Sequence, residues 1–356
     1  MEQNMLWDMP LLILFLIFTF VDLETLILFK CVNKFYYNLI TSLLKDPHFI
    51  SERFKDFSKE SGVLCDPARG FLVSENGNLQ VMIEMPITMT STCLQCNGVL
   101  CISDKNMIET YLVNPAIKEF HRLPQPEMHA NILVGGMGLG YDSRGRDFKV
   151  IRIGTGADQI TVAEIYSLST DAWRHIAAPV LLKRYYKVLK SVYCDDVFYW
   201  SFYGMKSTFI LCFNMYDEEF YTLPLPRNFY NEDKAWTIAV FNGLLALITY
   251  PLFAVYNLVI EVWVVDSFST NVGVCWKKIV SVGPLEPCMQ GTPLDFWNND
   301  ELLIHHPGGY ASSYNIRTQK TKRIKRVGEN LKNGVMISDK AFGYKPKHLS
   351  VRPRIP

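Results

Sequence analysis

Nine cysteines are scattered along the 356-residue chain, and three of them lie close enough together to suggest metal chemistry. Cys93 and Cys96 form a Cys-x-x-Cys pair, and Cys101 follows shortly after. A structural zinc site needs four ligands, and no second Cys or His pair stands at the required spacing. Free Cys is among the most buried residue types, so we expect core thiols beside a strand turn. The odd number of cysteines argues against a disulfide framework and for a reducing compartment.

Two other stretches could hold a metal or a phosphate, but their context favours a structural role. His305 and His306 are adjacent in a strand-like run, where successive side chains point to opposite faces of a sheet. The glycine string 135–140 lacks the following helix of a dinucleotide fingerprint, so it predicts a turn and tight strand packing. The chain has no Gly-x-Ser-x-Gly elbow, no His-Glu-x-x-His motif and no P-loop. We therefore expect no catalytic residue, no metal and no cofactor.

Basic residues gather near the end of the sequence, at Arg317, Lys320, Lys322, Arg323, Lys325 and Arg326. Residues 317–356 carry 12 basic and 2 acidic side chains, a net charge of +10, whereas residues 63–316 carry 18 and 25, a net charge of −7. Such a cluster is typical of a nuclear or nucleic-acid-binding patch, but Lys and Arg also guard exposed strand edges. The whole chain has a net charge of only +1, so we expect a guarded edge and no nucleic-acid partner.

The first segment of the chain is apolar and has a helical pattern. Hydrophobic residues make up 49% of the chain and charged residues 20%, which excludes a disordered protein. The apolar run 9–21 is too short to span a membrane and has no basic flank, so we expect a buried helix and no membrane partner. A signal peptide is the alternative. The predicted location is the cytoplasm, with the nucleus as a second compartment.

Capping residues divide this segment into short helices. Asp22 predicts the start of a helix over about 23–31, and Asn33 predicts the start of another over about 34–44. Asp46-Pro47 looks like a further helix start, because Pro is favoured in a first turn. We therefore expect a helical domain over residues 1–60 with three or four helices.

From about residue 62 the pattern changes to short β-like runs that repeat. A polar turn followed by an apolar strand recurs near residues 98, 145, 196, 243 and 300. A second unit, in which a strand and a polar turn lead to an aromatic residue, recurs with a similar period and includes Phe120, Trp173, Phe220 and Trp276. Two hairpins in about 50 residues make one four-stranded blade. Stacking such blades around an axis is expected to bury the repeated aromatic residues between them. Residues 61–356 thus predict an all-β, kelch-like β-propeller of five or six blades. Either residues 63–96 or residues 333–350 would complete its ring. A β-sandwich is the alternative.

The helical segment resembles a plant F-box. Met9-Pro10 stands where the family has Leu-Pro, and the run Phe29-Lys-Cys-Val-Asn-Lys34 matches its most specific phrase. The family's closing Phe-Ile appears as Phe49-Ile50. The remainder resembles the F-box-associated domain, and more narrowly the S-locus F-box proteins, through phrases at 96–101, 114–124, 138–142, 147–152, 164–173 and 220–226.

This resemblance implies a non-catalytic adaptor of an SKP-cullin-F-box E3 ubiquitin ligase. The F-box would bind an SKP-family adaptor and through it a cullin, and propeller loops would hold a protein target. For S-locus members the implied target is a pistil S-ribonuclease, a basic protein met during pollen self-incompatibility. A general plant F-box adaptor for another target is the alternative.

The implied SKP-binding set combines apolar anchors with two lysines at the rim. It comprises Pro10, Ile13, Leu14, Ile17, Leu26, Phe29, Lys30, Val32, Lys34 and Leu39. The structural alternative is that the apolar members pack the helices together. Leu11, Leu12 and Leu28 stand where the family pattern carries charge. One alternative is therefore a degenerate F-box protein that binds its target without engaging the ligase. Another alternative is a propeller hydrolase or sugar-binding protein, which would need paired carboxylates and an export signal.

Overall fold

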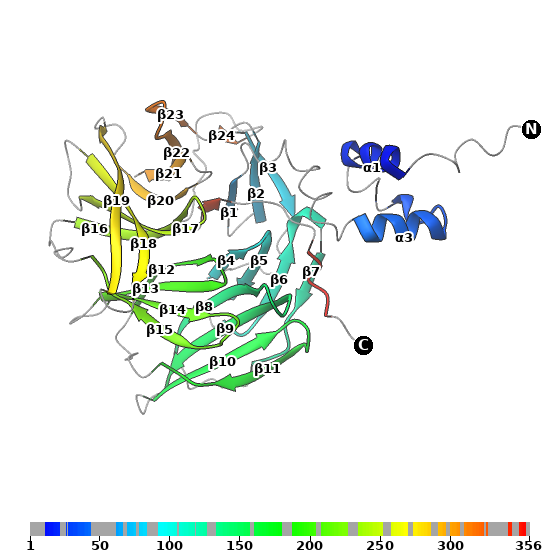
Figure 1. Cartoon of the computed structure of the whole chain (residues 1–356), viewed down its shortest axis with the longest axis horizontal. Helices are drawn as coiled ribbons and strands as arrows, with labels where there is room; N and C mark the ends of the chain where they lie inside the picture. Colours follow the sequence, from blue (N-terminus) through cyan, green and yellow to red (C-terminus); the bar gives the residue numbers. More distant parts are fainter. Residues whose placement is uncertain are drawn as a thin grey trace, which may run out of the picture.

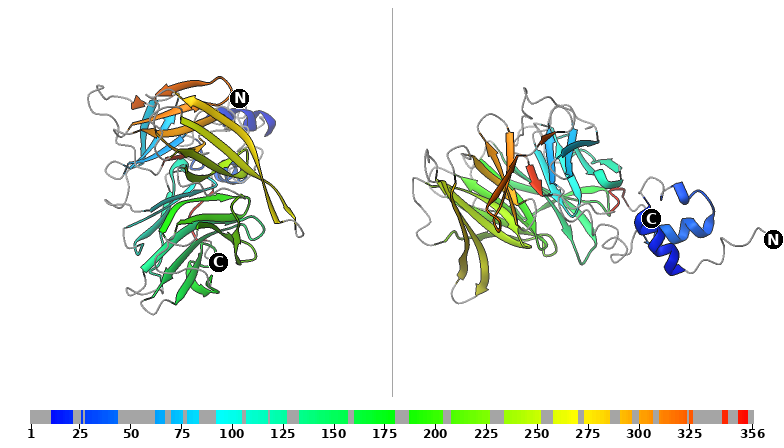
Figure 2. Two further views of the ribbon diagram at one scale, coloured as in Figure 1. Left: turned by 90° about the vertical axis from the view of Figure 1, so that its left-hand side faces the viewer. Right: turned by 90° about the horizontal axis from the view of Figure 1, so that it is seen from above.

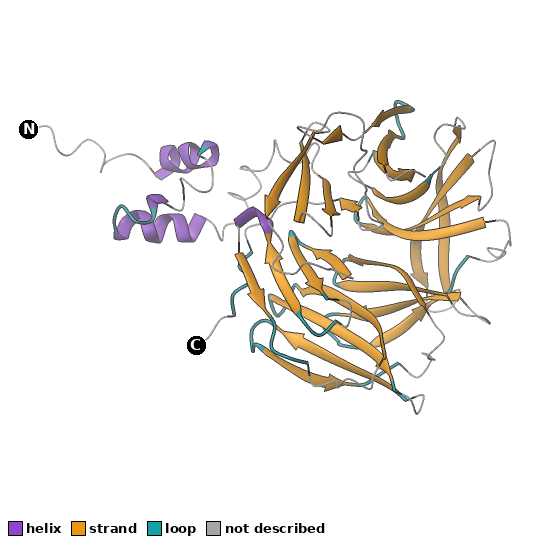
Figure 3. Ribbon diagram, turned by 180° about the vertical axis from the view of Figure 1, so that it is seen from behind, coloured by secondary structure: helices purple, strands orange, loops and turns teal. Residues whose placement is uncertain are grey.

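The computed structural model of the chain contains a small helical part and a large body of β-sheets (Figure 3). It describes residues 11–21, 26, 28–43, 62–66, 70–75, 78–83, 92–104, 107–117, 119–126, 133–156, 160–179, 187–203, 208–226, 234–251, 258–269, 273–285, 291–296, 300–306, 310–323, 325–326, 341–343 and 349–353. The helices lie beside the strands, not among them (Figure 1). The predicted domain boundary at residue 60 lies outside the described residues and stays a prediction.

Five of the sheets are four-stranded blades, each formed by four consecutive antiparallel strands. Blade 1 contains β4 (Thr92–Cys96), β5 (Val99–Ser103), β6 (Thr110–Asn114) and β7 (Glu119–Arg122). Blade 2 contains β8 (Leu133–Asp142), β9 (Asp147–Thr155), β10 (Thr161–Ser167) and β11 (Ala172–Ile176). Blade 3 contains β12 (Lys187–Cys194), β13 (Val197–Tyr203), β14 (Thr208–Asn214) and β15 (Phe220–Leu223).

Blade 4 contains β16 (Lys234–Phe241), β17 (Leu244–Pro251), β18 (Leu258–Ser269) and β19 (Gly273–Leu285). Blade 5 contains β20 (Thr292–Phe296), β21 (Glu301–His306), β22 (Tyr310–Asn315) and β23 (Lys320–Arg323). The first strands of adjacent blades face one another, and a short 3-10 helix over Pro115–Ile117 joins β6 to β7. Figure 2 shows the blades from two further directions.

The sixth sheet is shared by the two ends of the propeller. It contains β1 (Gly62–Asp66), β2 (Gly70–Glu75), β3 (Asn78–Ile83), β24 (Lys325–Arg326) and β25 (Ala341–Gly343), in the order β24-β3-β2-β1-β25. Because β25 pairs with β1 and lies beside β20 of blade 5, the late strand closes the ring on the early one. The predicted fold class, a small helical domain followed by a propeller of five or six blades, is confirmed, and both candidate segments contribute to the closure.

Tight turns between strands lie where the repeats predicted them. Asn97-Gly98, Asp195-Asp196 and Asn242-Gly243 each connect two strands, and all six residues have positive φ between 49° and 76°. Two-residue hairpins need this conformation because it matches the right-handed twist of the flanking strands, and Asn, Asp and Gly adopt it at the lowest cost. The turn chemistry of the sequence therefore fixes which strands are neighbours.

The glycine string 135–140 lies inside β8, so the predicted turn is wrong and the predicted tight packing is correct. A Cβ on Gly138 would meet the Trp200 ring at 2.6 Å, and one on Gly140 would meet Met215 at 2.1 Å. Trp200 is fully buried and donates its indole N–H to the carbonyl oxygen of Met137 at 2.9 Å. The glycines thus let large side chains of blade 3 approach the backbone of blade 2.

One prediction about the repeated aromatics needs correction. Trp173 is 7% exposed, but Phe120 is 61% exposed, although both were expected between blades. Residues of β7 alternate between half-buried and exposed, and Phe120 falls on the exposed face of this outermost strand. A repeat in sequence therefore identifies the strand but not which of its faces a neighbour covers.

The helical part contains α1 (Leu11–Phe20) and α3 (Lys34–Leu43), with helical residues also at 26, 28 and 29. The Asn33 side chain accepts a 3.0 Å hydrogen bond from the backbone N–H of Tyr36, so the predicted N-cap of α3 is confirmed. The predicted caps at Asp22 and Asp46 lie outside the described residues. None of the helices in the described segments is both long and apolar enough to span a bilayer.

Candidate protein-interaction sites

The helical part has a small core of its own. Leu14 and Phe18 of α1 are buried against Leu26 and Ile40. Three aromatic rings extend this core, because the ring centroids of Phe18, Phe29 and Tyr36 lie 6.0 to 6.2 Å apart. These contacts hold α1, the helical residues 26–29 and α3 together.

The helical part also leaves many apolar side chains in solvent, on the sides of its helices that do not pack into this core. On α1 the exposed residues are Leu11, Ile13, Leu16 and Ile17. Leu28, Val32, Phe35 and Tyr37 are exposed nearby in sequence, and all eight are between 42% and 67% exposed. Large apolar surfaces of this kind mark binding sites in soluble proteins, since contact with water is unfavourable for them.

The structure divides the predicted SKP-binding residues into three groups. Ile13, Ile17, Val32 and Lys34 are exposed, and Phe29, Lys30 and Leu39 are half-buried. Leu14 and Leu26 are buried in the helical core, where they shape the surface without facing solvent. Pro10 lies outside the described residues. The set of SKP contacts stays a prediction.

Sequence analysis missed several apolar residues of this surface. Leu16, Phe35 and Tyr37 were not selected, although all three are exposed. The Lys30 ammonium lies 5.7 Å from the centre of the Tyr37 ring, at the edge of the apolar surface. Because α1 is apolar on every side, periodicity cannot separate its buried face from its exposed face. Tyr37 could have been found, since it lies in the first turn after the predicted cap Asn33, next to the half-buried Tyr36.

The propeller presents two different sides. Consecutive strands of each blade run in opposite directions. The connections after the first and third strands of a blade therefore lie on one side of the propeller. The connection after the second strand and the link to the next blade lie on the other side. The two-residue turns belong to the first side. The described ends of longer connections, such as residues 107–109 and 123–126, belong to the second, which we call the long-loop side. Recognition loops are expected there, because loops on a rigid scaffold can vary without disturbing it.

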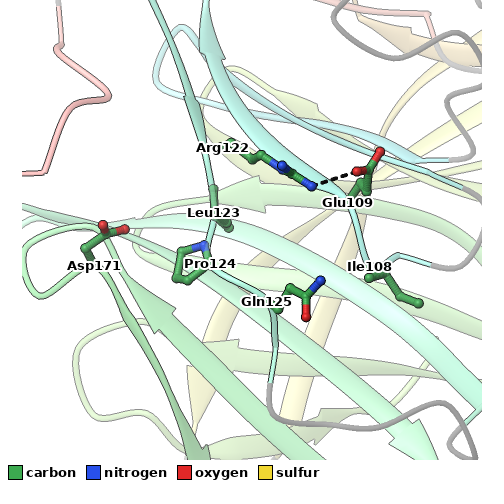
Figure 4. Close-up of a pocket in the computed structure, with 7 residues that line it drawn as sticks. All are labelled: Ile108, Glu109, Arg122, Leu123, Pro124, Gln125 and Asp171. Carbon is green, nitrogen blue, oxygen red and sulfur yellow. Dashed lines mark hydrogen bonds and ion pairs between the residues drawn. The ribbon is translucent and has the colours of Figure 1, made fainter.

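A pocket of about 320 Å³ opens between blades 1 and 2 (Figure 4). Its lining combines apolar and charged groups: Ile108, Glu109, Arg122, Leu123, Pro124, Gln125 and Asp171. Arg122 donates a 2.7 Å hydrogen bond to Glu109 at one wall of the pocket. At the opposite end, Oδ1 of Asp171 accepts hydrogen bonds from the Tyr166 hydroxyl at 2.8 Å and from the His121 ring at 2.9 Å. The pocket can therefore hold an apolar side chain beside a charged one.

The cysteines and histidines that suggested metal chemistry lie in two different blades, Cys93, Cys96 and Cys101 in blade 1 and His305 and His306 in blade 5. Cys96 and Cys101 are fully buried in blade 1, and burial raises the pKa of the Cys101 thiol to about 12. A thiol with such a pKa stays protonated at neutral pH and is a weak nucleophile. His306 is buried against the Ser312 hydroxyl. Over the described ranges, no three His, Cys, Asp or Glu side chains are grouped as a metal site would require.

These observations define a class of protein: a small helical unit with an exposed apolar face, followed by a β-propeller with a side of longer loops. Comparison with protein families gives the same division. Residues 6–48 match the F-box domain, and residues 73–352 match the F-box associated beta propeller domain. The chain belongs to the F-box proteins with an F-box-associated propeller.

Curated relatives come from Arabidopsis thaliana. A putative F-box protein is 30% identical to this chain, and the match covers 58% of this chain and 57% of that protein. A second F-box protein is 24% identical, and the match covers 52% of this chain and 51% of that protein. The chain thus matches only about half the length of these relatives. Among solved structures, a chain of a nidogen/laminin complex is 11% identical with a TM-score of 0.45, covering 74% of this chain and 93% of that chain.

Proposed function

We propose that this protein is the target-binding subunit of an SKP-cullin-F-box ubiquitin ligase. The observation that carries the proposal is the exposed apolar face of the helical unit, which belongs to the F-box match and has no cover within the described residues. Interface cores are built from such aliphatic and aromatic anchors, with charged residues kept to the rim. Lys30 is consistent with that rim, since its ammonium lies 5.7 Å from the Tyr37 ring, and Lys34 is exposed next to Phe35 in the chain.

The test is binding of the full chain to a purified SKP-family protein. Replacing Ile13 and Ile17 by Glu places two charges on the exposed face without touching the helical core. We expect at least tenfold weaker binding, because buried unpaired charge is costly in an interface. Ile160→Glu is the matched control, since Ile160 is 61% exposed on the propeller. No binding of the unchanged chain at micromolar concentration, or equal binding of the double variant, would contradict the proposal.

A degenerate F-box is a second candidate, favoured by one observation. Leu28 is 67% exposed where the resemblance places a charged residue, so an apolar group stands at the surface in place of a charge. A ubiquitination assay with reconstituted ligase separates the two candidates. Activity comparable to that of a regular F-box protein would remove the degenerate candidate. Strong activation by Leu28→Arg, from a low starting activity, would support it.

For the target, we propose binding at the long-loop side of the propeller. The net charge of −7 over residues 63–316 favours a basic protein, which is consistent with the narrower prediction of a pistil ribonuclease. Charge-steered association slows as salt screens the attraction. Association of a basic ribonuclease with the full chain should therefore slow between 50 and 500 mM salt. An association rate independent of salt would contradict a charge-selected target.

A further inference from the structure

The last described residues of the chain, 349–353, lie against blade 1 and belong to neither a helix nor a strand. We call them the C-terminal strap. In sequence they follow β25 of the shared sheet, and in space they run beside β7, on the same side of the propeller as the helical part (Figure 1). The strap therefore connects the shared sheet, which closes the ring, to the first of the five four-stranded blades.

One buried side chain and a few hydrogen bonds hold the strap in place. Val351 is fully buried and packs into the core that blades 1 to 3 share. The side-chain amide of Asn114, at the end of β6, donates a 2.8 Å hydrogen bond to the carbonyl oxygen of Leu349. The carboxylate of Glu119, at the start of β7, accepts hydrogen bonds from the Ser350 hydroxyl at 2.8 Å and from the Val351 N–H at 3.3 Å. Glu119 is therefore the main polar attachment of the strap, because a carboxylate makes stronger hydrogen bonds than a neutral acceptor.

Ser350 is the point of the strap that a modifying enzyme can reach. It is exposed, although the neighbouring Val351 is fully buried. In the sequence Lys347 stands three positions before Ser350, and Lys345 stands five positions before it. Residues 345–356 include no acidic side chain and no other hydroxyl group. A serine in this setting is typical of the substrates of kinases whose acidic grooves select basic peptides.

We propose that Ser350 is a phosphorylation site and that its phosphate releases the C-terminal strap from blade 1. A serine kinase transfers the γ-phosphoryl group of ATP to the Ser350 Oγ. The bond between this phosphorus and ADP breaks, a P–Oγ bond forms, and the hydroxyl proton passes to the catalytic base of the kinase. The product no longer has the O–H that donates to Glu119, and it carries a charge of about −1.5 to −2 at neutral pH.

The position of this phosphate beside Glu119 accounts for the release. A phosphoserine next to a carboxylate is destabilising because like charges repel. The Nε of Arg352 lies 3.6 Å from the Glu119 carboxylate, and the backbone N–H of Arg352 donates to the Ser350 hydroxyl oxygen at 3.2 Å. Because Arg352 belongs to the strap itself, its guanidinium can pair with the phosphate and leave Glu119. The burial of Val351 and the two hydrogen bonds of the strap's backbone then remain to hold it.

The strap can open without unfolding the blades. A kinase binds the residues on both sides of its serine, so Val351 must leave the core before the reaction. Segments with few buried contacts and no regular secondary structure open at a low free energy, and the strap has a single fully buried side chain. The full chain should therefore be phosphorylated more slowly than a free peptide of the same sequence, and the phosphate then opposes closure of the strap.

The first test follows transfer of phosphate from ATP to the full chain by a purified kinase that selects a basic residue three positions before serine. We expect phosphate at Ser350, located by mass spectrometry. Transfer to Glu119→Ala should be about tenfold faster, because this variant lacks the carboxylate that attaches the strap. Ser143 is the matched control, because it is also exposed and also donates to a carboxylate, that of Asp196. The ten residues before Ser143 include no basic side chain, so Ser143 should stay unmodified.

The second test compares hydrogen exchange of residues 349–356 in the unchanged chain and in a chain that carries phosphoserine at position 350. We expect exchange about tenfold faster in the phosphoserine chain, which is the effect of losing one hydrogen bond to a charged group. In Glu119→Gln the phosphate should accelerate exchange less, because the amide keeps an acceptor but carries no charge. Exchange in β9, whose nine residues are all buried, should not change, which shows that the blades stay folded.

Four results would overturn the proposal. Absence of phosphate from the full chain, when a free peptide of residues 343–356 accepts it, would show that the strap does not open to the enzyme. Absence of phosphate from the peptide as well would show that the sequence is no kinase substrate. Unchanged exchange in the phosphoserine chain, or equal acceleration in Glu119→Gln, would show that repulsion from Glu119 does not release the strap. The strap shares no residue with the apolar surface of the helical part, so none of these results depends on SKP binding.

Discussion

The indole N–H of Trp173, in the outermost strand of blade 2, donates a 2.8 Å hydrogen bond to the carbonyl oxygen of Pro124, at the end of blade 1. The same contact recurs two blades further on, where Trp276 donates to Pro224 at 2.9 Å. In both cases a Leu-Pro pair ends one blade and a Trp from the next blade binds its carbonyl. The contact is thus a repeated link between adjacent blades.

Replacing Trp173 by Phe should destabilise the protein by about 1 to 3 kcal/mol, because the change removes the donor and leaves the Pro124 carbonyl without a partner. The equivalent change at Trp276 should cost less, since that indole group is more exposed to water. Free energies of unfolding in urea, followed by circular dichroism, check this order. An equal loss in the two variants would show that burial does not set the strength of the link.

A buried lysine links blades 2 and 3. The Lys149 ammonium donates to Asp142 at 3.0 Å, to the Met215 carbonyl at 2.7 Å and to Glu218 at 2.9 Å. Removing one member of a buried ionic group leaves the others uncompensated, so Lys149→Met should lower the free energy of unfolding by about 3 to 5 kcal/mol.

Lys234→Met is the control for this change. Lys234 pairs with Glu261 but is 45% exposed, so its loss should cost less than about 1 kcal/mol. Urea denaturation of both variants gives the comparison. A cost for Lys149→Met as small as that for Lys234→Met would contradict a structural role of the buried group.

The same ionic group predicts a loss of stability in acid. Burial alone would raise the pKa of Asp142 and of Glu218, but hydrogen bonds outweigh burial and lower both pKa values. Asp142 accepts these hydrogen bonds from Gly145 and Lys149. Glu218 accepts them from Arg174 and Lys149. A carboxyl group with a lowered pKa stabilises the fold at neutral pH, and this contribution is lost as the pH falls through its folded pKa.

The free energy of unfolding should therefore decrease from about pH 4.5 downward, which is near the ordinary pKa of Glu. In the Lys149→Met variant this decrease should be smaller, because the lysine no longer favours the two carboxylates. Thermal unfolding monitored between pH 3 and pH 6 measures both slopes. Equal slopes would show that other groups dominate the acid transition.

The glycines of β8 show what the sequence does and does not predict. Periodic turns and strands predicted the blades, and Asn33 predicted the start of α3, because these signals are local. The role of Gly138 depends on Trp200, which is distant in sequence, so the glycine string was mistaken for a turn. In the same way, the exposed face of α1 is set by how the helices pack, and a helix apolar on every side carries no pattern that reveals it.

The packing of these glycines predicts a graded series of substitutions. Gly138→Ala should destabilise the protein by about 1 to 3 kcal/mol, because its Cβ would lie 2.6 Å from the buried Trp200 ring. Gly135→Ala is the control, since its Cβ would meet the nearest atom, the Ile153 carbonyl oxygen, at an ordinary 3.8 Å. Equal stability of the two variants in urea would contradict the tight approach of blades 2 and 3.

Asp295, in the first strand of blade 5, predicts a pH dependence of the opposite sign. Burial raises its pKa to about 6, although Lys190 and backbone N–H groups of Phe296 and Val240 partly oppose this. Between the ordinary pKa near 4 and about 6 the folded protein binds more protons than the unfolded one, so this residue makes stability fall as the pH rises. Asp295→Asn keeps an acceptor for the Phe296 N–H at 2.9 Å but cannot ionise. The variant should therefore gain stability relative to the unchanged protein as the pH is raised from 4 to 7, and a difference that stays constant across this range would show that Asp295 does not titrate there.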